Sequence, residues 1–299
     1  MQKIFVILGQ TATGKSALAV SLAKKINGEI ISADSRQVYK KLDIGTGKIT
    51  PNERVLRTGQ TKKEYVFTHK NIPHYLIDVA NPKNKFTVAE YQKLAISAMT
   101  DIFKRGKTPI ICGGTGFYID AITKGIIFPE VPPNPKLRKK LVSLSAIALF
   151  GTLKKLDPAR AKNIKEKNEQ NNKVRLIRAI EIAKVLGKVP KITETKPKYK
   201  FIKIGLYLPE EKLKKKVEQR VKKMFQAGLL NEIKKLKRSG ISNKRLQELG
   251  FEYFNPTPEG VISETFKYAK RQMTWFKRDK EIKWYDSSKI NYRDIIEKL

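Results

Sequence analysis

Residues 9–16 read Gly-Gln-Thr-Ala-Thr-Gly-Lys-Ser, and no other stretch constrains the fold as strongly. Two glycines five positions apart, followed by lysine and a hydroxyl side chain, match the spacing of a phosphate-binding loop. The short, apolar, β-branched segment 3–8 precedes the loop and predicts a buried strand. Apolar residues at helical spacing run from Ala17 to Ile26 and predict a helix. Strand, glycine loop and helix N-terminus together predict an anion-binding site in an α/β fold.

The loop supplies three kinds of group that bind phosphate. Backbone N–H groups converge on the anion, and the dipole of the following helix adds positive potential. We expect Lys15 to bind a terminal phosphate and the Ser16 hydroxyl to ligate Mg²⁺. A chance glycine turn with a solvated lysine is the alternative, and the flanking strand and helix argue against it. The predicted phosphate-binding residues are Gly9, Gln10, Thr11, Ala12, Thr13, Gly14, Lys15 and Ser16.

Charge is the strongest compositional signal in the 299 residues. Lysine and arginine number 63 against 28 acidic residues, which gives a formal net charge of +35. Such an excess favours a polyanionic partner such as a nucleic acid. A lysine-rich proteome, in which every surface drifts basic, would give the same composition, so charge alone leaves both explanations open.

The sequence also indicates the cellular compartment in which the chain is expected. No apolar run approaches the ~20 residues of a membrane span, so we expect no membrane association. The first strand begins at Lys3, which leaves no room for a signal peptide before the loop. Cys112 is the single cysteine, which excludes an internal disulfide and fits a reducing cytoplasm.

A carboxylate follows the second predicted strand, at 29–33. Ligands of open parallel sheets bind at the carboxyl ends of the strands, so Asp34 is expected beside the phosphate-binding loop. A helix N-cap role for Asp34 is equally compatible with its position. A second glycine-rich turn at 113–116 follows a predicted strand at 108–112 and belongs to the same edge of the sheet.

The region between these strands is less regular. Residues 46–71 are polar and predict a long excursion outside the core, followed by a weaker strand at 72–79. Asp78 is compatible with a second metal-binding carboxylate, although a turn or cap is the favoured interpretation. His69 and His74 have no evident ligand partners in the sequence and are predicted to be non-catalytic.

Four prolines between 129 and 135 predict a domain boundary. From about 136 to 190 the sequence is helical and basic, and Arg175 and Arg178 lie on one helical face. We therefore predict a helical insertion at 129–199. The parallel-sheet core then comprises 1–128 and 200–299, with a returning strand at 201–208.

In their joint order, the motifs of the chain resemble those of bacterial tRNA dimethylallyltransferases, the IPP transferase family. The resemblance covers nearly the whole length. Beyond the phosphate-binding loop it rests on Asp-Ser-Arg-Gln-Val-Tyr at 34–39, Asp-Ile-Gly-Thr at 43–46, Ile-Pro-His-Tyr-Leu-Ile-Asp at 72–78, Gly-Gly-Thr-Gly-Phe-Tyr at 113–118 and Lys-Arg-Gln-Met-Thr-Trp-Phe at 270–276.

The resemblance implies that the loop holds the diphosphate of dimethylallyl diphosphate, and that the allyl group goes to N6 of adenine 37 in tRNA. It implies that Thr11 and Arg220 lie near the leaving diphosphate and that Asp34 lies near N6. Mg²⁺ is the expected cofactor, and the chain is expected to act as a cytoplasmic monomer. The implied tRNA-binding residues are Asp34, Ser35, Arg36, Gln37, Thr115, Arg138, Arg175 and Arg178.

The chain departs from the family pattern in three places. Gln10 replaces the usual proline of the loop, Val174 replaces a glutamine, and Phe251-Glu252 replaces tyrosine followed by lysine or arginine. The last two bear on tRNA contacts. Other functions compatible with the sequence are transfer to a free adenine nucleotide, an ATP-dependent kinase and a non-enzymatic RNA-binding module. The large positive charge argues against the first, and the loop with Asp34 argues against the last.

Overall fold

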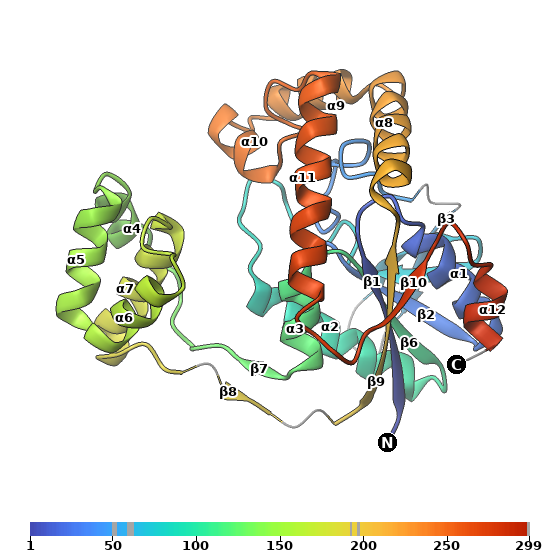
Figure 1. Ribbon diagram of the computed structural model, residues 1–299, viewed down its shortest axis with the longest axis horizontal. Helices are drawn as coiled ribbons and strands as arrows, with labels where there is room; N and C mark the ends of the chain where they lie inside the picture. Colours follow the sequence, from blue (N-terminus) through green and yellow to red (C-terminus); the bar gives the residue numbers. More distant parts are fainter. Residues whose placement is uncertain (50–52, 59–62, 192, 196–197, 298–299) are drawn as a thin grey trace. The chain divides into compact units, whose positions relative to one another are not determined.

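The computed structural model describes residues 1–49, 53–58, 63–191, 193–195 and 198–297 (Figure 1). Contacts divide the chain into two compact units. Unit 1 comprises Met1–Gly125 with Lys196–Leu299, and unit 2 comprises Ile126–Thr195. Among the described residues, no helix combines the length and the apolar character needed to cross a membrane.

The described residues of unit 1 form an eight-stranded sheet in the order β10-β9-β1-β6-β2-β5-β4-β3. The six strands from β10 to β5 pair in parallel, and β5, β4 and β3 pair antiparallel. The predicted α/β fold with a parallel sheet is therefore confirmed. The strands are β1 (Lys3–Gly9), β2 (Gly28–Ala33), β3 (Glu53–Thr58), β4 (Lys63–His69), β5 (Ile72–Tyr75), β6 (Thr108–Gly113), β9 (Lys200–Tyr207) and β10 (Lys283–Asp286).

The prediction of an excursion at 46–71 is wrong for much of that segment. Strands β3 and β4 lie there and extend the sheet as an antiparallel hairpin. An edge hairpin of this kind can be polar, because it need not be buried on both faces as the central parallel strands are. The polar composition of this segment is therefore the reason that these two strands were not predicted.

Strand β1 is buried on both sides of the sheet. Ile4, Val6 and Leu8 pack into one apolar cluster, and Phe5 and Ile7 pack into a second cluster on the opposite face. Successive side chains of a strand point to opposite faces, so a continuous apolar run is needed where both faces are covered. This explains why the segment before the phosphate-binding loop has no polar alternation.

Helices cover both faces of this sheet (Figure 1). Helices α1 and α12 pack against the face that carries Phe5 and Ile7, whereas α2 and α3 pack against the other. The helices of unit 1 are α1 (Lys15–Lys25), α2 (Val88–Lys104), α3 (Gly116–Thr123), α8 (Glu210–Gln226), α9 (Leu229–Arg238), α10 (Asn243–Leu249), α11 (Pro258–Phe276) and α12 (Tyr292–Glu297).

The strand register brings three strand ends to one edge. Leu8 of β1 pairs with Gly113 of β6, and Gly113 pairs with Ala33 of β2. The segments that follow these residues are the phosphate-binding loop, the turn beginning at Asp34 and the second glycine turn. All three therefore meet at the edge where parallel sheets bind ligands.

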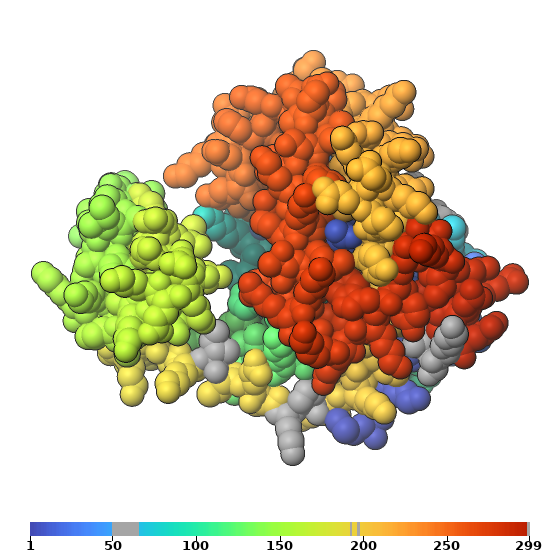
Figure 2. All heavy atoms as spheres, viewed as in Figure 1, coloured from blue at the N-terminus to red at the C-terminus, as the bar shows by residue number. Residues whose placement is uncertain are grey.

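Unit 2, drawn in green to yellow in the space-filling view of Figure 2, is a small helical body with its own core. Helices α4 (Pro135–Val142), α5 (Ala146–Leu156), α6 (Pro158–Glu166) and α7 (Lys173–Leu186) surround buried leucines and isoleucines such as Leu149, Leu153 and Ile180. A short antiparallel pair, β7 (Ile126–Ile127) and β8 (Thr193–Glu194), lies where the chain enters and leaves the unit. On α7, Leu176, Ala179, Ile180 and Ala183 are buried.

Candidate active site

The phosphate-binding loop joins β1 directly to α1. Gly9 has a φ of 135°, and a Cβ atom there would lie 2.1 Å from the Leu206 carbonyl oxygen, so only glycine fits. Gly14 has a φ of 86° and forms the N-cap of α1, which begins at Lys15. Ser16 therefore lies in the first turn of α1, where its hydroxyl is exposed. The unpaired N–H groups of this helix start form an anion-binding end.

Lys15 is the charged group of the loop. Its Nζ donates to the Gln10 carbonyl oxygen at 2.6 Å. Burial lowers the pKa of Lys15 to about 8, although Cys112 and Asp34 act in the opposite direction. A cation held in this way gains from an anionic ligand, which would restore the solvation that the ammonium group has lost.

Gln10, which replaces the family's usual proline, ties the loop to β9. Its side chain is buried, and its Oε1 accepts a hydrogen bond from the Leu208 backbone N–H at 3.3 Å. The Thr13 hydroxyl donates to the Gln10 carbonyl oxygen at 2.8 Å. The glutamine therefore makes a side-chain bond that proline could not make.

Asp34 begins a tight turn at the end of β2. Its Oδ1 accepts hydrogen bonds from the backbone N–H groups of Arg36 at 2.9 Å and Gln37 at 3.3 Å. Within the described residues, Oδ2 accepts no hydrogen bond. Asp34 is close enough to raise the pKa of Lys15 and of Arg220 against the larger effect of burial. One carboxylate oxygen is thus used for structure and the other is open for chemistry.

Two bridges connect the three strand-end segments. The Thr115 hydroxyl, in the second glycine turn, accepts a hydrogen bond from the Ser35 N–H at 2.9 Å. Gln272 of α11 accepts from the Thr11 backbone N–H at 2.8 Å and donates to the Gly114 carbonyl oxygen at 2.9 Å. Gln272 had no predicted role. The signal that could have found it is a glutamine on the buried stripe of α11, among Val261, Thr265, Ala269 and Phe276.

The Arg36 side chain is partly buried and paired. Its Nη1 lies 2.6 and 2.5 Å from the two Glu252 carboxylate oxygens, and its guanidinium group lies over the Phe251 and Tyr268 rings. Although burial works to lower it, Glu252 holds the pKa of Arg36 above its usual value. Phe251 and Glu252, which depart from the family pattern, are therefore the partners of a residue in the Asp34 turn.

Arg220 of α8 reaches the same site from another element. Its Nη2 donates to the Thr46 carbonyl oxygen at 3.1 Å, and burial lowers its pKa. A Cβ atom at Gly47 would lie 2.1 Å from this nitrogen, so the glycine makes room for the guanidinium group. A cavity of about 580 Å³ opens between Ala12 of the loop and Arg220. Its apolar lining includes Ile44, Ile49, Phe67, Met224 and Ala227.

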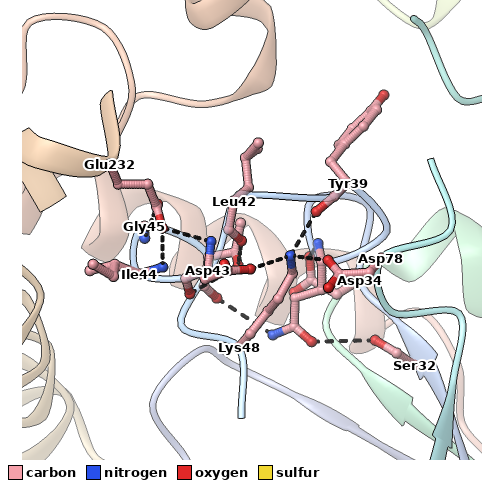
Figure 3. Close-up of polar contacts among 12 residues, drawn as sticks. Ser32, Asp34, Tyr39, Leu42, Asp43, Ile44, Gly45, Lys48, Asp78 and Glu232 are labelled. Carbon is pink, nitrogen blue, oxygen red and sulfur yellow. Dashed lines mark hydrogen bonds and ion pairs between the residues drawn. The ribbon is translucent and has the colours of Figure 1, made fainter. Parts of the chain in front are cut away.

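Figure 3 shows how the segment carrying Thr46 is held. Glu232 of α9 accepts hydrogen bonds from three successive backbone N–H groups, those of Asp43, Ile44 and Gly45, at 2.8–3.1 Å. Lys48 donates to Asp43 at 2.8 Å and to Asp78 at 2.5 Å. The positive φ of Asp78 and its ion pair with Lys48 support the interpretation of a turn residue over that of a metal ligand.

In unit 2, the predicted tRNA-binding arginines are engaged with carboxylates. Arg138 binds both oxygens of the buried Glu181 at 2.7 Å, and Arg178 donates to the Val131 carbonyl oxygen at 2.8 Å while pairing with Glu181. Arg175 pairs with Glu169. Each of these arginines therefore has an acidic partner within the unit, and their binding to tRNA remains a prediction.

The phosphate-binding loop follows β1 of a mostly parallel sheet, and Asp34 follows β2 at the same edge of that sheet. These features define an α/β protein of the phosphate-loop class. The sequence profile described as IPP transferase matches residues 37–279. The chain therefore belongs to the IPP transferase family.

Relatives match over nearly the whole chain. The tRNA dimethylallyltransferase of Carboxydothermus hydrogenoformans is 38% identical, with 100% of this chain and 96% of the relative covered. A crystal structure of the full-length tRNA isopentenylpyrophosphate transferase from Bacillus halodurans has a TM-score of 0.69 at 33% identity, with 100% and 94% of the two chains covered. A eukaryotic dimethylallyltransferase acting on tRNA has a TM-score of 0.75 at 27% identity, with 96% and 74% covered.

Proposed function

We propose that this chain transfers the dimethylallyl group of dimethylallyl diphosphate to N6 of adenine 37 in tRNA and releases diphosphate. The observation that carries the proposal is the presence of Asp34, with an open carboxylate oxygen, in the same site as Lys15 and Arg220. Asp34 is the base for the adenine amine, and Lys15 and Arg220 are the cations for the leaving diphosphate. Family membership supplies the substrates.

Asp34 acts on the nucleophile. An adenine amine is weak because its lone pair is conjugated into the ring, and a carboxylate that accepts its N–H raises its reactivity. A bond forms between N6 and the allyl carbon while the carbon–oxygen bond to diphosphate breaks. The oxygen keeps the bonding electrons, and the N6 proton passes to Asp34. Adenine 37 must leave its stack to reach this carboxylate.

Lys15, Arg220 and the loop N–H groups stabilise the leaving diphosphate as negative charge develops on it. Next to them, the cavity lined by Ala12, Ile44 and Met224 offers an apolar surface for the dimethylallyl group. The same cavity is also lined by Arg220, and a site that combines a cation with apolar side chains suits an isoprenoid diphosphate. We infer that the substrate lies with its diphosphate on the loop.

Mg²⁺ fits this site through Ser16. The described residues contain no group of three or more histidine, cysteine or acidic side chains that could hold a metal alone. Mg²⁺ commonly takes few protein ligands together with substrate phosphate oxygens, and the exposed Ser16 hydroxyl at the helix start suits that mode. When bound, the ion would neutralise charge on the diphosphate. We also propose that the reaction takes place in the cytoplasm and that a single chain carries it out.

Labelled dimethylallyl diphosphate tests the proposed function. We expect label to enter unmodified tRNA and to be lost when adenine 37 is replaced by guanine, which lacks the N6 amine. Parallel reactions contain AMP, ADP or ATP in place of tRNA. Label in a free nucleotide and none in tRNA would contradict the proposal, as would ATP turnover without allyl transfer.

We also predict that Arg178→Ala weakens tRNA binding and reduces the steepness of its dependence on salt. Each arginine that neutralises a phosphate contributes about one unit to the salt slope. Because Arg178 also donates to the Val131 carbonyl oxygen, the variant should unfold at a lower temperature.

Arg178→Lys is the matched control, since it keeps the charge and loses the planar donor geometry. The lysine variant should regain the salt slope while remaining less stable. If Arg178→Ala binds tRNA with the parental affinity and slope, Arg178 serves only the structure of unit 2.

A further inference from the structure

Gln272 is a buried glutamine with every side-chain polar group engaged by the strand-end segments. Its Oε1 accepts from both the backbone N–H and the hydroxyl of Thr11, at 2.8 and 3.2 Å, and its Nε2 donates to the Gly114 carbonyl oxygen at 2.9 Å. The residue is 5% exposed. The partners fix the orientation of the amide, because the oxygen must meet the donors of Thr11 and the nitrogen must meet the carbonyl.

The side-chain amide of Gln272 is tightly packed against Gly114. A Cβ atom at Gly114 would lie 2.1 Å from Nε2, so the backbone of the second glycine turn lies directly against Gln272. The adjacent Thr115 accepts the hydrogen bond from the Ser35 N–H. Thr11, Gln272, Gly114–Thr115 and Ser35 therefore form one continuous chain of contacts. This chain runs from the phosphate-binding loop, across the end of β6, to the turn that begins at Asp34.

We propose that Gln272 is a positioning residue that sets the separation between the phosphate-binding loop and the Asp34 turn, an inference that rests on the proposed function. The shorter bond, to the Thr11 N–H, anchors the loop backbone. The longer bond, from the Thr11 hydroxyl, can be exchanged for a diphosphate oxygen without loss of the backbone anchor. Gln272 thus presents the Thr11 hydroxyl to the leaving group while keeping the base at a fixed distance.

Gln272→Met tests this role because methionine keeps the volume and removes all three hydrogen bonds. We expect kcat to fall by about 10- to 100-fold, the cost of misplacing reacting groups by about 1 Å. The KM for tRNA should be unchanged. Gln272→Glu keeps an acceptor for Thr11 but faces the Gly114 carbonyl with an oxygen and adds negative charge. It should also raise the KM for dimethylallyl diphosphate and weaken binding of inorganic diphosphate.

A double-mutant cycle separates positioning from general stability. In a Thr11→Val background, which lacks the hydroxyl, Gln272→Met should cost at least threefold less in kcat than it does in the parent. Thr274→Val, on the exposed face of the same helix, should leave kcat unchanged. The proposal is overturned if Gln272→Met retains the parental kcat, or if its loss is the same in both backgrounds.

If Gln272→Met does not fold, the test of the proposal is made with Gln272→Glu. Parental values of kcat and of both KM constants for Gln272→Glu would overturn the proposal. These outcomes are distinct from failure of the proposed function, which would appear as absence of label transfer to tRNA by the parent enzyme.

Discussion

Asp34→Asn should lower turnover by about 10²- to 10⁴-fold, the usual cost of removing a general base. Asparagine keeps the shape and can still accept through Oδ1 from the Arg36 and Gln37 N–H groups, so the turn should persist. It loses the charge and the basicity needed to take the N6 proton. Affinity for tRNA and for dimethylallyl diphosphate should be nearly unchanged. Single-turnover transfer of labelled allyl group, with separate binding measurements, tests both parts.

A Mg²⁺ titration distinguishes a base from a metal ligand at this position. Added Mg²⁺ should not rescue Asp34→Asn, because a missing base cannot be supplied by more cation. Asp101→Asn, an exposed aspartate paired with Arg105 on α2, is the control for the same chemical change away from the site. Recovery of the full rate at high Mg²⁺ would show that Asp34 binds the metal and that its assignment as base is wrong.

Lys15→Ala should remove most activity, on the order of 10²-fold or more, because it deletes a charge aimed at the developing diphosphate. Binding of tRNA should be nearly intact, since Lys15 faces the loop, where its Nζ donates to the Gln10 carbonyl oxygen. Lys24→Ala, at the exposed end of the same helix, is the matched control. A Lys15→Ala enzyme that turns over like the parent would exclude the loop as the diphosphate site.

The pH dependence of diphosphate binding offers a second measurement on Lys15. Its pKa of about 8 in the free protein means that the ammonium form predominates below pH 8 and the neutral amine above it. Diphosphate binds the charged form, so its affinity should weaken as pH rises through 8, and binding above that pH should take up a proton. Calorimetry in buffers of different ionisation enthalpy measures the uptake, and Lys15→Ala should abolish it.

Strands β1, β2, β6 and β9, the phosphate-binding loop and the second glycine turn were predictable because their signals are local. A continuous apolar run indicates a strand covered on both faces, and two glycines with lysine and serine indicate a phosphate-binding loop. The hairpin of β3 and β4 was not predicted, because polar strands at the edge of a sheet lack a continuous apolar run. Residue roles taken from the family resemblance, such as those of Asp34 and Arg178, remain predictions that the proposed variants test.

The sequence by itself determined the phosphate-binding loop and the position of Asp34 at a carboxyl edge, since each follows from residues close together in the chain. The class of chemistry followed from the resemblance of motifs that are spread along the whole chain. Only the tertiary structure decided which partner each polar group takes. Gln272 meets Thr11 across 261 positions, and Arg36 meets Glu252 across 216. The same holds for Arg138 and Arg178, which converge on Glu181. Buried polar groups must find partners, and packing rather than sequence spacing determines which of them lie within reach.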